Sequence, residues 1–250
     1  VACAPTGATI ASCGGDRGVF VWDVATGAAV RKWAGHEGRG GANAVEFAGE
    51  SASVCASAGD DASVRVWDVR SRDVNAVQVL NARTGVGFGD AVTSIAVDEG
   101  GGARLSCASV DGSVRTVDLR RGTCDVDVIG APVTCVRLSG DNQCALVGCL
   151  TSRVGLIDVA SGDTLATYRG HVAETAKTEC CLTNDDAYVI AGSEDGRVCI
   201  WELVSARLVS EIQAHGVGSA VCGVDCSRPG TSPKLVTTGA DGRAHVWVPA

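Results

Sequence analysis

Residues 188–202, YVIAGSEDGRVCIWE, carry the pattern that decides the fold. A strand of small and apolar residues leads into a turn at Asp195, and a second apolar strand follows and ends at Trp201-Glu202. Short apolar runs on both sides of an Asp-Gly turn are typical of a β-hairpin. No segment of the chain shows a convincing helical period with helix caps, which indicates a nearly all-β fold.

This hairpin is one copy of an internal repeat. Its closing pair recurs in steps of 40 to 50 residues, the period of a four-stranded propeller blade. The pairs are Trp22-Asp23, Trp67-Asp68, Val117-Asp118, Ile157-Asp158, Trp201-Glu202 and Trp247-Val248. An Asp stands six residues before five of these pairs, and Thr151 takes its place in the other copy; the five are Asp16, Asp61, Asp111, Asp195 and Asp241. A constant offset in five copies indicates one structural role for this Asp.

The repeats predict an all-β β-propeller that forms a single domain over residues 1–250, and they resemble those of WD-repeat propellers over the whole chain. Six blades are expected, the last one incomplete, in units of about 1–34, 35–80, 81–129, 130–169, 170–213 and 214–250. The chain begins at an inner strand and ends before the outer strand of its last blade. We therefore expect it to be a fragment of a seven-bladed parent with an unclosed ring.

A buried polar network is expected in each blade, in which a loop His bonds to the turn Asp and, through a Ser or Thr, to the Trp indole. One unit has all four residues: His171, Ser193, Asp195 and Trp201. Partial sets are His36, Asp61 and Trp67; His215, Asp241 and Trp247; Asp16 and Trp22; and Asp111 alone. Gly14, Gly59 and Gly239 stand where the Ser is expected, so these blades are predicted to be held less firmly.

Charge and cysteine content restrict the function classes. The formal charge of −8 argues against a general nucleic-acid or anionic-membrane binder. Most of the thirteen cysteines lie in apolar runs and none forms a Cys-x-x-Cys pair, which is typical of small buried residues in a reducing compartment. No apolar stretch approaches the roughly 20 residues of a membrane span. We expect a monomer in the cytoplasm and nucleus that contacts neither nucleic acid directly nor membrane.

Three motifs resemble catalytic, nucleotide-binding or metal sites, but a structural interpretation is favoured for each. His171, Ser193 and Asp195 lack an elbow or oxyanion hole, so a structural network is favoured over a hydrolase triad. The glycine-rich segment 85–89 does not lead from a strand into a helix and is interpreted as a flexible loop. His215, Cys222 and Cys226 match no standard zinc spacing. No catalytic residue, cofactor or metal is therefore predicted.

Four stretches of the chain resemble the mitogen-activated protein kinase organizer family of WD-repeat proteins. They are residues 14–36 (GGDRGVFVWDVATGAAVRKWAGH), 109–122 (SVDGSVRTVDLRRG), 130–150 (GAPVTCVRLSGDNQCALVGCL) and 179–204 (ECCLTNDDAYVIAGSEDGRVCIWELV). The resemblance implies a seven-bladed scaffold that assembles kinases of the Raf–MEK–ERK type and associates with the spliceosome in pre-mRNA splicing. The six units found here depart from that pattern.

The expected function is a non-enzymatic scaffold whose partners are proteins, either kinase-cascade components or splicing factors. Binding is expected in the loops 35–43, 81–90 and 170–177, with Glu174, Lys177 and Glu179 as candidate contacts in or beside the last one. An alternative is a substrate receptor of a cullin-type ubiquitin ligase, because Trp67-Asp68-Val69-Arg70 resembles the Trp-Asp-x-Arg box, in which Arg70 is the contact. Ser232, followed by Pro, is a candidate phosphorylation site.

Overall fold

A computed structural model describes residues 1–37, 40–49, 51–98, 101, 103–227 and 234–248. The chain divides into two compact units, residues 1–130 (unit 1) and 131–250 (unit 2). Each unit contains three antiparallel sheets, each of which is one blade, so the prediction of an all-β propeller with six blades is confirmed. The described residues contain no α-helix; one 3-10 turn, η1 (Ala82–Thr84), lies in unit 1.

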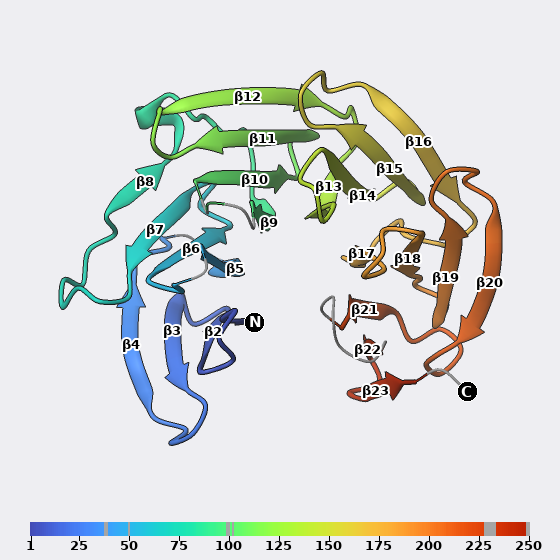
Figure 1. Cartoon of the computed structure of the whole chain (residues 1–250), viewed down its shortest axis with the longest axis horizontal. Helices are drawn as coiled ribbons and strands as arrows, with labels where there is room; N and C mark the ends of the chain where they lie inside the picture. The colour runs from blue at the N-terminus through green and yellow to red at the C-terminus, as the bar shows by residue number, and fades with distance from the viewer. Residues whose placement is uncertain (38–39, 50, 99–100, 102, 228–233, 249–250) are drawn as a thin grey trace. The chain divides into compact units, whose positions relative to one another are not determined.

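Unit 1 holds three four-stranded blades, numbered 1 to 3 along the chain (Figure 1). Blade 1 consists of β1 (Ala2–Cys3), β2 (Thr9–Cys13), β3 (Gly18–Asp23) and β4 (Ala29–Ala34). Blade 2 consists of β5 (Ala42–Ala48), β6 (Val54–Gly59), β7 (Val64–Asp68) and β8 (Gln78–Leu80). Blade 3 consists of β9 (Val92–Val97), β10 (Arg104–Ser109), β11 (Ser113–Asp118) and β12 (Thr123–Val128).

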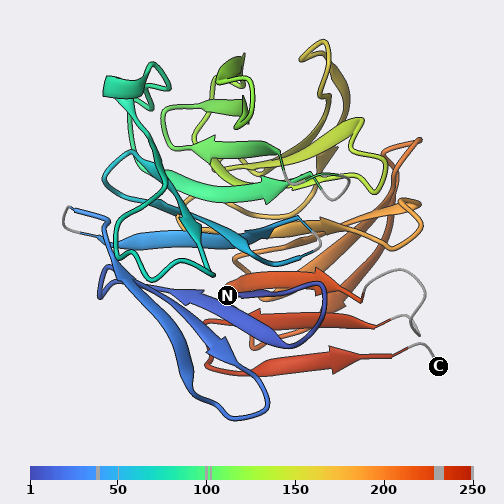
Figure 2. The ribbon, with the colours of Figure 1, turned by 60° about the vertical axis from the view of Figure 1, so that its left-hand side comes forward.

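Unit 2 holds blades 4 to 6. Blade 4 consists of β13 (Val133–Leu138), β14 (Cys144–Cys149), β15 (Arg153–Asp158) and β16 (Thr164–Arg169). Blade 5 consists of β17 (Cys180–Leu182), β18 (Tyr188–Gly192), β19 (Arg197–Glu202) and β20 (Leu208–Gln213). Blade 6 has three strands in the described part of the chain, β21 (Val221–Cys226), β22 (Leu235–Gly239) and β23 (Ala244–Trp247), which Figure 2 shows stacked in order.

Small apolar side chains fill the space between neighbouring blades of one unit. The core shared by blades 1 and 2 combines Val19 and Val21 of β3 with Phe47 and Cys55 of blade 2. Such a core suits a chain with only 4 % aromatic residues, because small apolar side chains can fill most of the space between the blades. First strands of successive blades contact each other within a unit, β5 with β9 and β17 with β21, so the blades pack face to face.

Aromatic pairs join neighbouring blades at equivalent positions. Trp33 of β4 stacks on Trp67 of β7, with ring centroids 5.3 Å apart. In unit 2, Tyr168 of β16 packs on Trp201 of β19 at 6.1 Å, and its hydroxyl donates to the carbonyl of Leu203. The Trp of the closing pair therefore anchors the outer strand of the preceding blade.

Two Asp positions shape the turns of most repeats. In the closing pair, Asp23 accepts a hydrogen bond from the backbone N–H of Thr26 at 2.8 Å, and Asp158 accepts from Ser161 in the same way. Six residues before the pair, Asp241 accepts from the N–H of Arg243, and Asp16, Asp111 and Asp195 make the equivalent bond. A side-chain acceptor two or three residues ahead of the donor defines an Asx turn, which explains both fixed positions.

The residue that follows the Asp six positions before the closing pair has a left-handed backbone. The φ angle is 84° at Gly112, 90° at Gly196 and 75° at Gly242, where glycine adopts this conformation without cost. Ala62, in blade 2, occupies the same position with φ 54°. An alanine there carries conformational strain that its glycine counterparts lack.

Candidate functional site

A four-residue polar network closes blade 2. The Nδ1 atom of His36 lies 2.9 Å from Asp61, whose carboxylate can only accept, so Nδ1 carries the proton. The Nε2 atom of His36 lies 2.8 Å from the hydroxyl of Ser57, and that hydroxyl accepts from the indole N–H of Trp67 at 2.9 Å. Ser57 therefore donates to His36 while it accepts from Trp67, and each buried polar atom of this chain of bonds has a partner.

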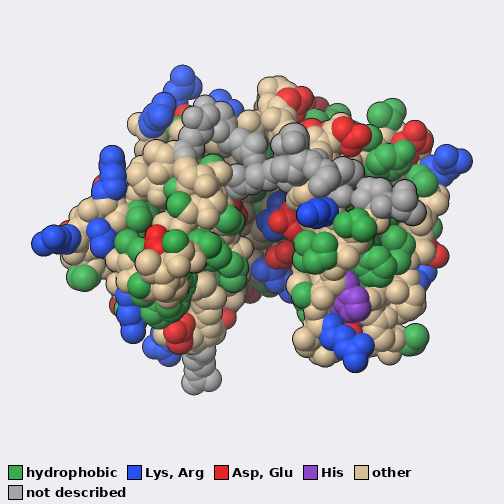
Figure 3. All heavy atoms as spheres, turned by 60° about the horizontal axis from the view of Figure 1, so that its bottom comes forward, with side chains coloured by type: hydrophobic (Ala, Val, Ile, Leu, Met, Phe, Trp, Pro, Cys, Tyr) green, Lys and Arg blue, Asp and Glu red, His purple; other side chains and the backbone are tan. Residues whose placement is uncertain are grey.

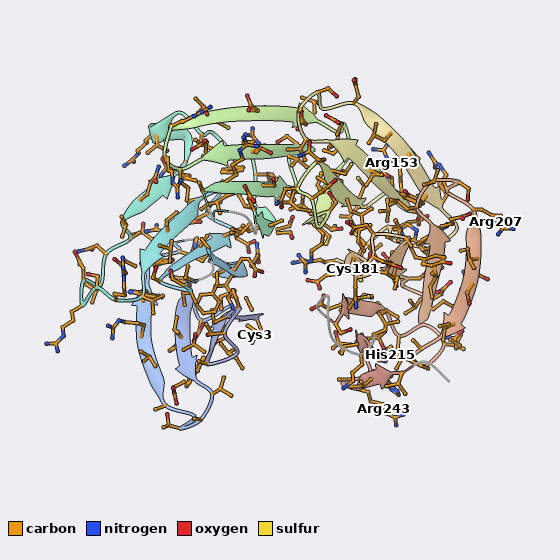
Figure 4. All side chains as sticks on the ribbon, in the orientation of Figure 1. Cys3, Arg153, Cys181, Arg207, His215 and Arg243 are labelled. Carbon is orange, nitrogen blue, oxygen red and sulfur yellow. The ribbon has the colours of Figure 1, made fainter. Side chains whose placement is uncertain are left out.

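Blade 6 contains the same network in unit 2. His215 pairs with Asp241 at 3.0 Å and with the hydroxyl of Thr237 at 3.0 Å, and Trp247 donates to that hydroxyl at 3.1 Å. Figure 4 labels His215 beside β22 and β23. The predicted grouping of His215, Asp241 and Trp247, like that of His36, Asp61 and Trp67, corresponds to these bonds.

The predicted position of the hydroxyl is wrong for blades 2 and 6. Gly59 and Gly239 are not vacant hydroxyl sites, because a Cβ there would lie 2.5 Å from Nδ1 of His36 and 2.4 Å from Nδ1 of His215. Glycine is needed so that the imidazole can reach its Asp. The hydroxyl comes from two residues earlier, at Ser57 and Thr237. These blades are therefore fully connected rather than weakly held.

The set that looked complete from the sequence, in blade 5, does not form the network. Ser193 carries the Cβ that Gly59 lacks, and its hydroxyl accepts from the N–H of Val172. Nδ1 of His171 is buried without a hydrogen-bond partner. Asp195 pairs instead with Arg197 at 2.7 Å, and Trp201 donates to the carbonyl of Arg169. Ala191 stands where a hydroxyl is required, so His171 and Trp201 meet only edge to face.

Burial lowers the pKa of His171 to about 4, although the carboxylate of Asp195 acts in the opposite direction. A neutral imidazole among apolar side chains explains the direction, because desolvation disfavours the charged form. In blade 2, burial raises the pKa of Asp61, but the hydrogen bonds from His36 and Ser63 outweigh it and bring the value to about 2. The His and Asp of the repeat are thus hydrogen-bonded to each other in blade 2, whereas in blade 5 the buried His has a lowered pKa and makes no such bond.

Blade 3 replaces the network with apolar packing. Phe88 takes the place of the His, since the N–H that follows it, of Gly89, bonds to Asp111 as Glu37 bonds to Asp61. Cys107 and Val117 occupy the hydroxyl and Trp positions, and all three side chains belong to one buried cluster. Because the His, the hydroxyl and the Trp are all replaced together, none of them is left without its partner. Asp111 remains and forms an ion pair with Arg115 at 2.9 Å.

Blade 1 retains part of the pattern. Trp22 donates to the hydroxyl of Ser12 at 2.8 Å, which is the same ten-residue offset as in blades 2 and 6. Asp16 accepts from the N–H of Gly18 and serves the turn alone. This constant offset from hydroxyl to Trp is the sequence signal that could have located the hydroxyl.

In the candidate binding loop 170–177, one carboxylate holds residues 174–176, while Val172 and Ala173 donate to the hydroxyls of Ser193 and Ser152. Oε1 of Glu194 accepts from the backbone N–H groups of Glu174, Thr175 and Ala176 at 2.6 to 2.8 Å. Burial raises the pKa of Glu194, but these bonds outweigh it and lower the pKa overall. The side chains of Glu174 and Lys177 are exposed on this fixed loop. Glu179 lies apart from them at the start of blade 5, where it pairs with Arg137 at 3.6 Å.

The loop 81–90 is less open than a flexible linker. Asn81 caps the 3-10 turn η1, and Val86 and Phe88 are buried in the core of unit 1. The glycine-rich segment therefore packs on blades 2 and 3 through its apolar members. In the loop 35–43, residues 38 and 39 lie outside the described residues, while Asn43 donates to the carbonyl of Val92 in blade 3.

Arg70 of the Trp-Asp-x-Arg box extends from the end of β7. Its side chain is 74 % exposed and forms an ion pair with Asp68 at 3.3 Å, while Arg31 donates to its backbone carbonyl. Trp67 of the same box is buried in the blade 2 network and presents no surface. Of the box, Arg70 is thus the exposed member, while Asp68 and Val69 are partly buried.

The remaining predictions concern sites that the structure does not provide or does not describe. Ser232 lies outside the described residues. Within the described ranges, no group of three or more His, Cys, Asp or Glu side chains is suited to a metal ion, and no helix has the length and hydropathy of a membrane span. Basic and acidic side chains occur on the same face in Figure 3, with hydrophobic and other groups between them.

These repeats define the class of fold, which is an all-β propeller with WD40 repeats. Residues 1–23, 27–68 and 162–202 match the family described as WD domain, G-beta repeat. The chain is 29 % identical over 258 residues to the WD repeat domain-containing protein 83 homolog of Dictyostelium discoideum, covering 93 % of this chain and 76 % of the relative. It is also similar to WD repeat domain-containing protein 83 of Rattus norvegicus, with 42 % identity over 139 residues, and of Mus musculus, with 40 % over 178 residues.

The matches to the vertebrate proteins cover only part of each chain. They include 56 % of this chain for the rat protein and 71 % for the mouse protein. They span 42 % and 52 % of the relatives, about half of their length.

Proposed function

We propose that this protein is a non-enzymatic scaffold that binds other proteins through the loop 170–177. The observation that carries the proposal is the bonding of three successive N–H groups to Glu194, which fixes the backbone while Glu174 and Lys177 remain exposed. A loop that is already ordered loses little conformational entropy when it binds. Exposed charges of both signs select a partner with the opposite arrangement.

The kind of partner follows from the resemblance of residues 109–122 and 179–204 to the mitogen-activated protein kinase organizer family. We propose that the partners are components of a kinase cascade, that the protein also associates with splicing complexes, and that it occurs in both cytoplasm and nucleus. Two enzymes held on one platform react faster because each raises the effective concentration of the other.

A charge-matched pair of variants tests the loop. In the full chain, Glu174→Ala with Lys177→Ala removes one acid and one base from the loop. The control, Arg72→Ala with Asp73→Ala, removes the same charges from an exposed loop of blade 2. We expect quantitative affinity capture to show loss of cascade kinases with the first variant only. Equal recovery of the kinases with both variants would exclude this loop as their binding site.

A second candidate function is a substrate receptor of a cullin-type ligase. The exposed Arg70 side chain at the end of β7 supports it, because an adaptor could contact the guanidinium directly. In that case Arg70→Ala abolishes binding of the purified adaptor, while Arg72→Ala, two residues away and also exposed, leaves it unchanged. Adaptor binding that survives Arg70→Ala rules out the box as the contact.

A further inference from the structure

Cysteines line the contacts between the first strands of unit 2. Cys135 is in β13, Cys180 and Cys181 are in β17, and Cys226 is in β21. β17 lies between the other two strands and contacts both. Successive side chains of a strand point to opposite faces, so Cys180 points toward β13 and Cys181 toward β21. Figure 4 labels Cys181 at this position among the first strands of unit 2.

The two faces of β17 therefore carry two thiol contacts. Sγ of Cys181 lies 3.6 Å from Sγ of Cys226, which is 45 residues further along the chain. On the opposite face, Sγ of Cys135 donates to the carbonyl of Cys180 at 3.6 Å. A disulfide requires the sulfur atoms to approach to about 2.0 Å. For Cys181 and Cys226 this is a short movement of two side chains on packed strands.

We propose that Cys181 and Cys226 form a reversible disulfide that joins blades 5 and 6 when the protein meets a peroxide. Both residues are free thiols in the structure. Cys226 is half-buried and Cys181 is 4 % exposed, so the oxidant reaches Cys226 first. Cys181 is then the resolving thiol, already in contact with the oxidised sulfur.

The electrostatics of the pair support this order. The hydrogen bond from the Cys181 thiol lowers the pKa of Cys226 and outweighs burial and the nearby Asp225, which act to raise it. The same hydrogen bond and burial raise the pKa of Cys181. Reaction with peroxide requires a thiolate, so Cys226 is the better nucleophile of the two.

The chemistry balances with one peroxide. The Cys226 thiolate attacks one peroxide oxygen, the O–O bond breaks, and a sulfenic acid forms. The other oxygen leaves as hydroxide and becomes water by taking up the proton that the Cys226 thiol released on ionisation. The sulfur of Cys181 then attacks the sulfur of the sulfenic acid and forms the S–S bond. The hydroxyl group leaves with the proton of Cys181 as a second water. Two thiols are oxidised by two electrons in total, and a dithiol reductant reverses the reaction.

Neighbouring cysteines do not offer the same reaction. Cys135 and Cys180 are 0 % and 1 % exposed, so a peroxide in solution does not reach them while the unit is folded. Cys222 is exposed on the same strand as Cys226. Four residues of extended strand separate these two by about 13 Å, which is too far for a disulfide. Cys181 is therefore the partner that the fold gives to Cys226.

The direct test maps the cross-link in the unaltered full chain. The protein is treated with a small excess of hydrogen peroxide, its free thiols are alkylated, and it is digested without reduction. We expect mass spectrometry to find the peptide containing Cys181 joined to the peptide containing Cys226, and reduction by dithiothreitol to separate them. Cys226 found only as a sulfenic or sulfinic acid, or joined to Cys222 of another molecule, would overturn the proposal.

Variants separate the pair from its surroundings. With Cys181→Ala, we expect the sulfenic acid of Cys226 to persist and to be trapped by dimedone at least about tenfold more than in the parent chain. Cys180→Ala, the adjacent residue on the opposite face of β17, is the matched control and retains the parent behaviour. Circular dichroism verifies that each variant is folded. Equal trapping in the two variants contradicts a resolving role for Cys181.

Discussion

The imidazole of His36 stands 2.9 Å from the carboxylate of Asp61, whereas the corresponding ring of His171 makes no hydrogen bond to Asp195. The two blades differ at the residue beside the ring, which is Gly59 in blade 2 and Ser193 in blade 5. A Cβ at Gly59 would lie 2.5 Å from Nδ1 of His36. The Cβ of Ser193, together with the hydroxyl that Ala191 lacks, thus separates an isolated buried imidazole from a connected network.

Restoring that space should restore the bond. In Ser193→Gly, we expect His171 to approach Asp195 and its pKa to rise from about 4 toward the ordinary range. Titration of the His171 ring proton by NMR measures the change. Ser193→Ala is the control, because it removes the hydroxyl but keeps the Cβ, and the pKa should stay low. A pKa that is the same in both variants would show that the Cβ is not what holds the ring away.

Removing the shared hydroxyl of blade 2 should destabilise the fold. Ser57→Ala leaves Nε2 of His36 and the indole N–H of Trp67 buried without their common partner. The expected loss in the free energy of unfolding is about 2 kcal/mol. Urea denaturation measures it, with Ser205→Ala as the control, because the Ser205 hydroxyl makes only exposed bonds, to Glu202 and from the backbone N–H of Arg207. A loss no greater than that of the control would mean that the network contributes little.

Stability should fall in acid in two stages. The pKa of His171 is lower in the folded chain than in the unfolded one, so the unfolded chain takes up the proton first. The contribution of neutral His171 to the free energy of unfolding is fully present above about pH 6.5. It decreases by on the order of 3 kcal/mol as the pH falls to about 4. Below about pH 4, protonation of Asp61, whose pKa in the folded chain is about 2, lowers the free energy of unfolding further. In His171→Leu, urea denaturation at several pH values should show the first stage absent; a stage that persists must come from another group.

The strained turn of blade 2 offers a stabilising change. Ala62→Gly places glycine at φ 54°, and relief of the left-handed strain should exceed the entropy that glycine adds to the unfolded chain. We expect a gain of about 0.5 kcal/mol in the free energy of unfolding. Gly112→Ala, at φ 84° in the same position of blade 3, should have the opposite sign. Two changes of the same sign would show that backbone strain does not decide these turns.

The repeat could be predicted from the sequence because its Asp positions act locally. Asp16, Asp111 and Asp241 each accept from a backbone N–H two residues ahead, so a fixed spacing along the chain is also a fixed geometry. The hydroxyl could not be placed as easily. Ser193 is next to the turn, whereas Ser57 reaches its Trp across two paired strands, where Cα partners are Ser57 with Arg65 and Cys55 with Trp67.

Contacts between blades could not be predicted from the sequence. The approach of Cys181 to Cys226 depends on how β17 and β21 are aligned, and among the strands that the structure describes no hydrogen-bonded register links different blades. The same applies to Trp33 on Trp67. From the sequence, the cysteines were interpreted as small buried residues, which describes Cys135 and Cys180 but misses the thiol pair.

The two residues of the closing pair perform separate tasks, and they can therefore be lost one at a time. Val117-Asp118 and Ile157-Asp158 have kept the Asp that shapes the following turn and have lost the Trp. Trp201-Glu202 and Trp247-Val248 have kept the indole and lost the Asp. Because the two residues act independently, one copy of the repeat can lose the Trp and another can lose the Asp. The two copies then share neither residue, although both still form the hairpin. Degenerate copies of such a repeat are therefore better recognised by the regular spacing of their turns than by the Trp-Asp dipeptide itself.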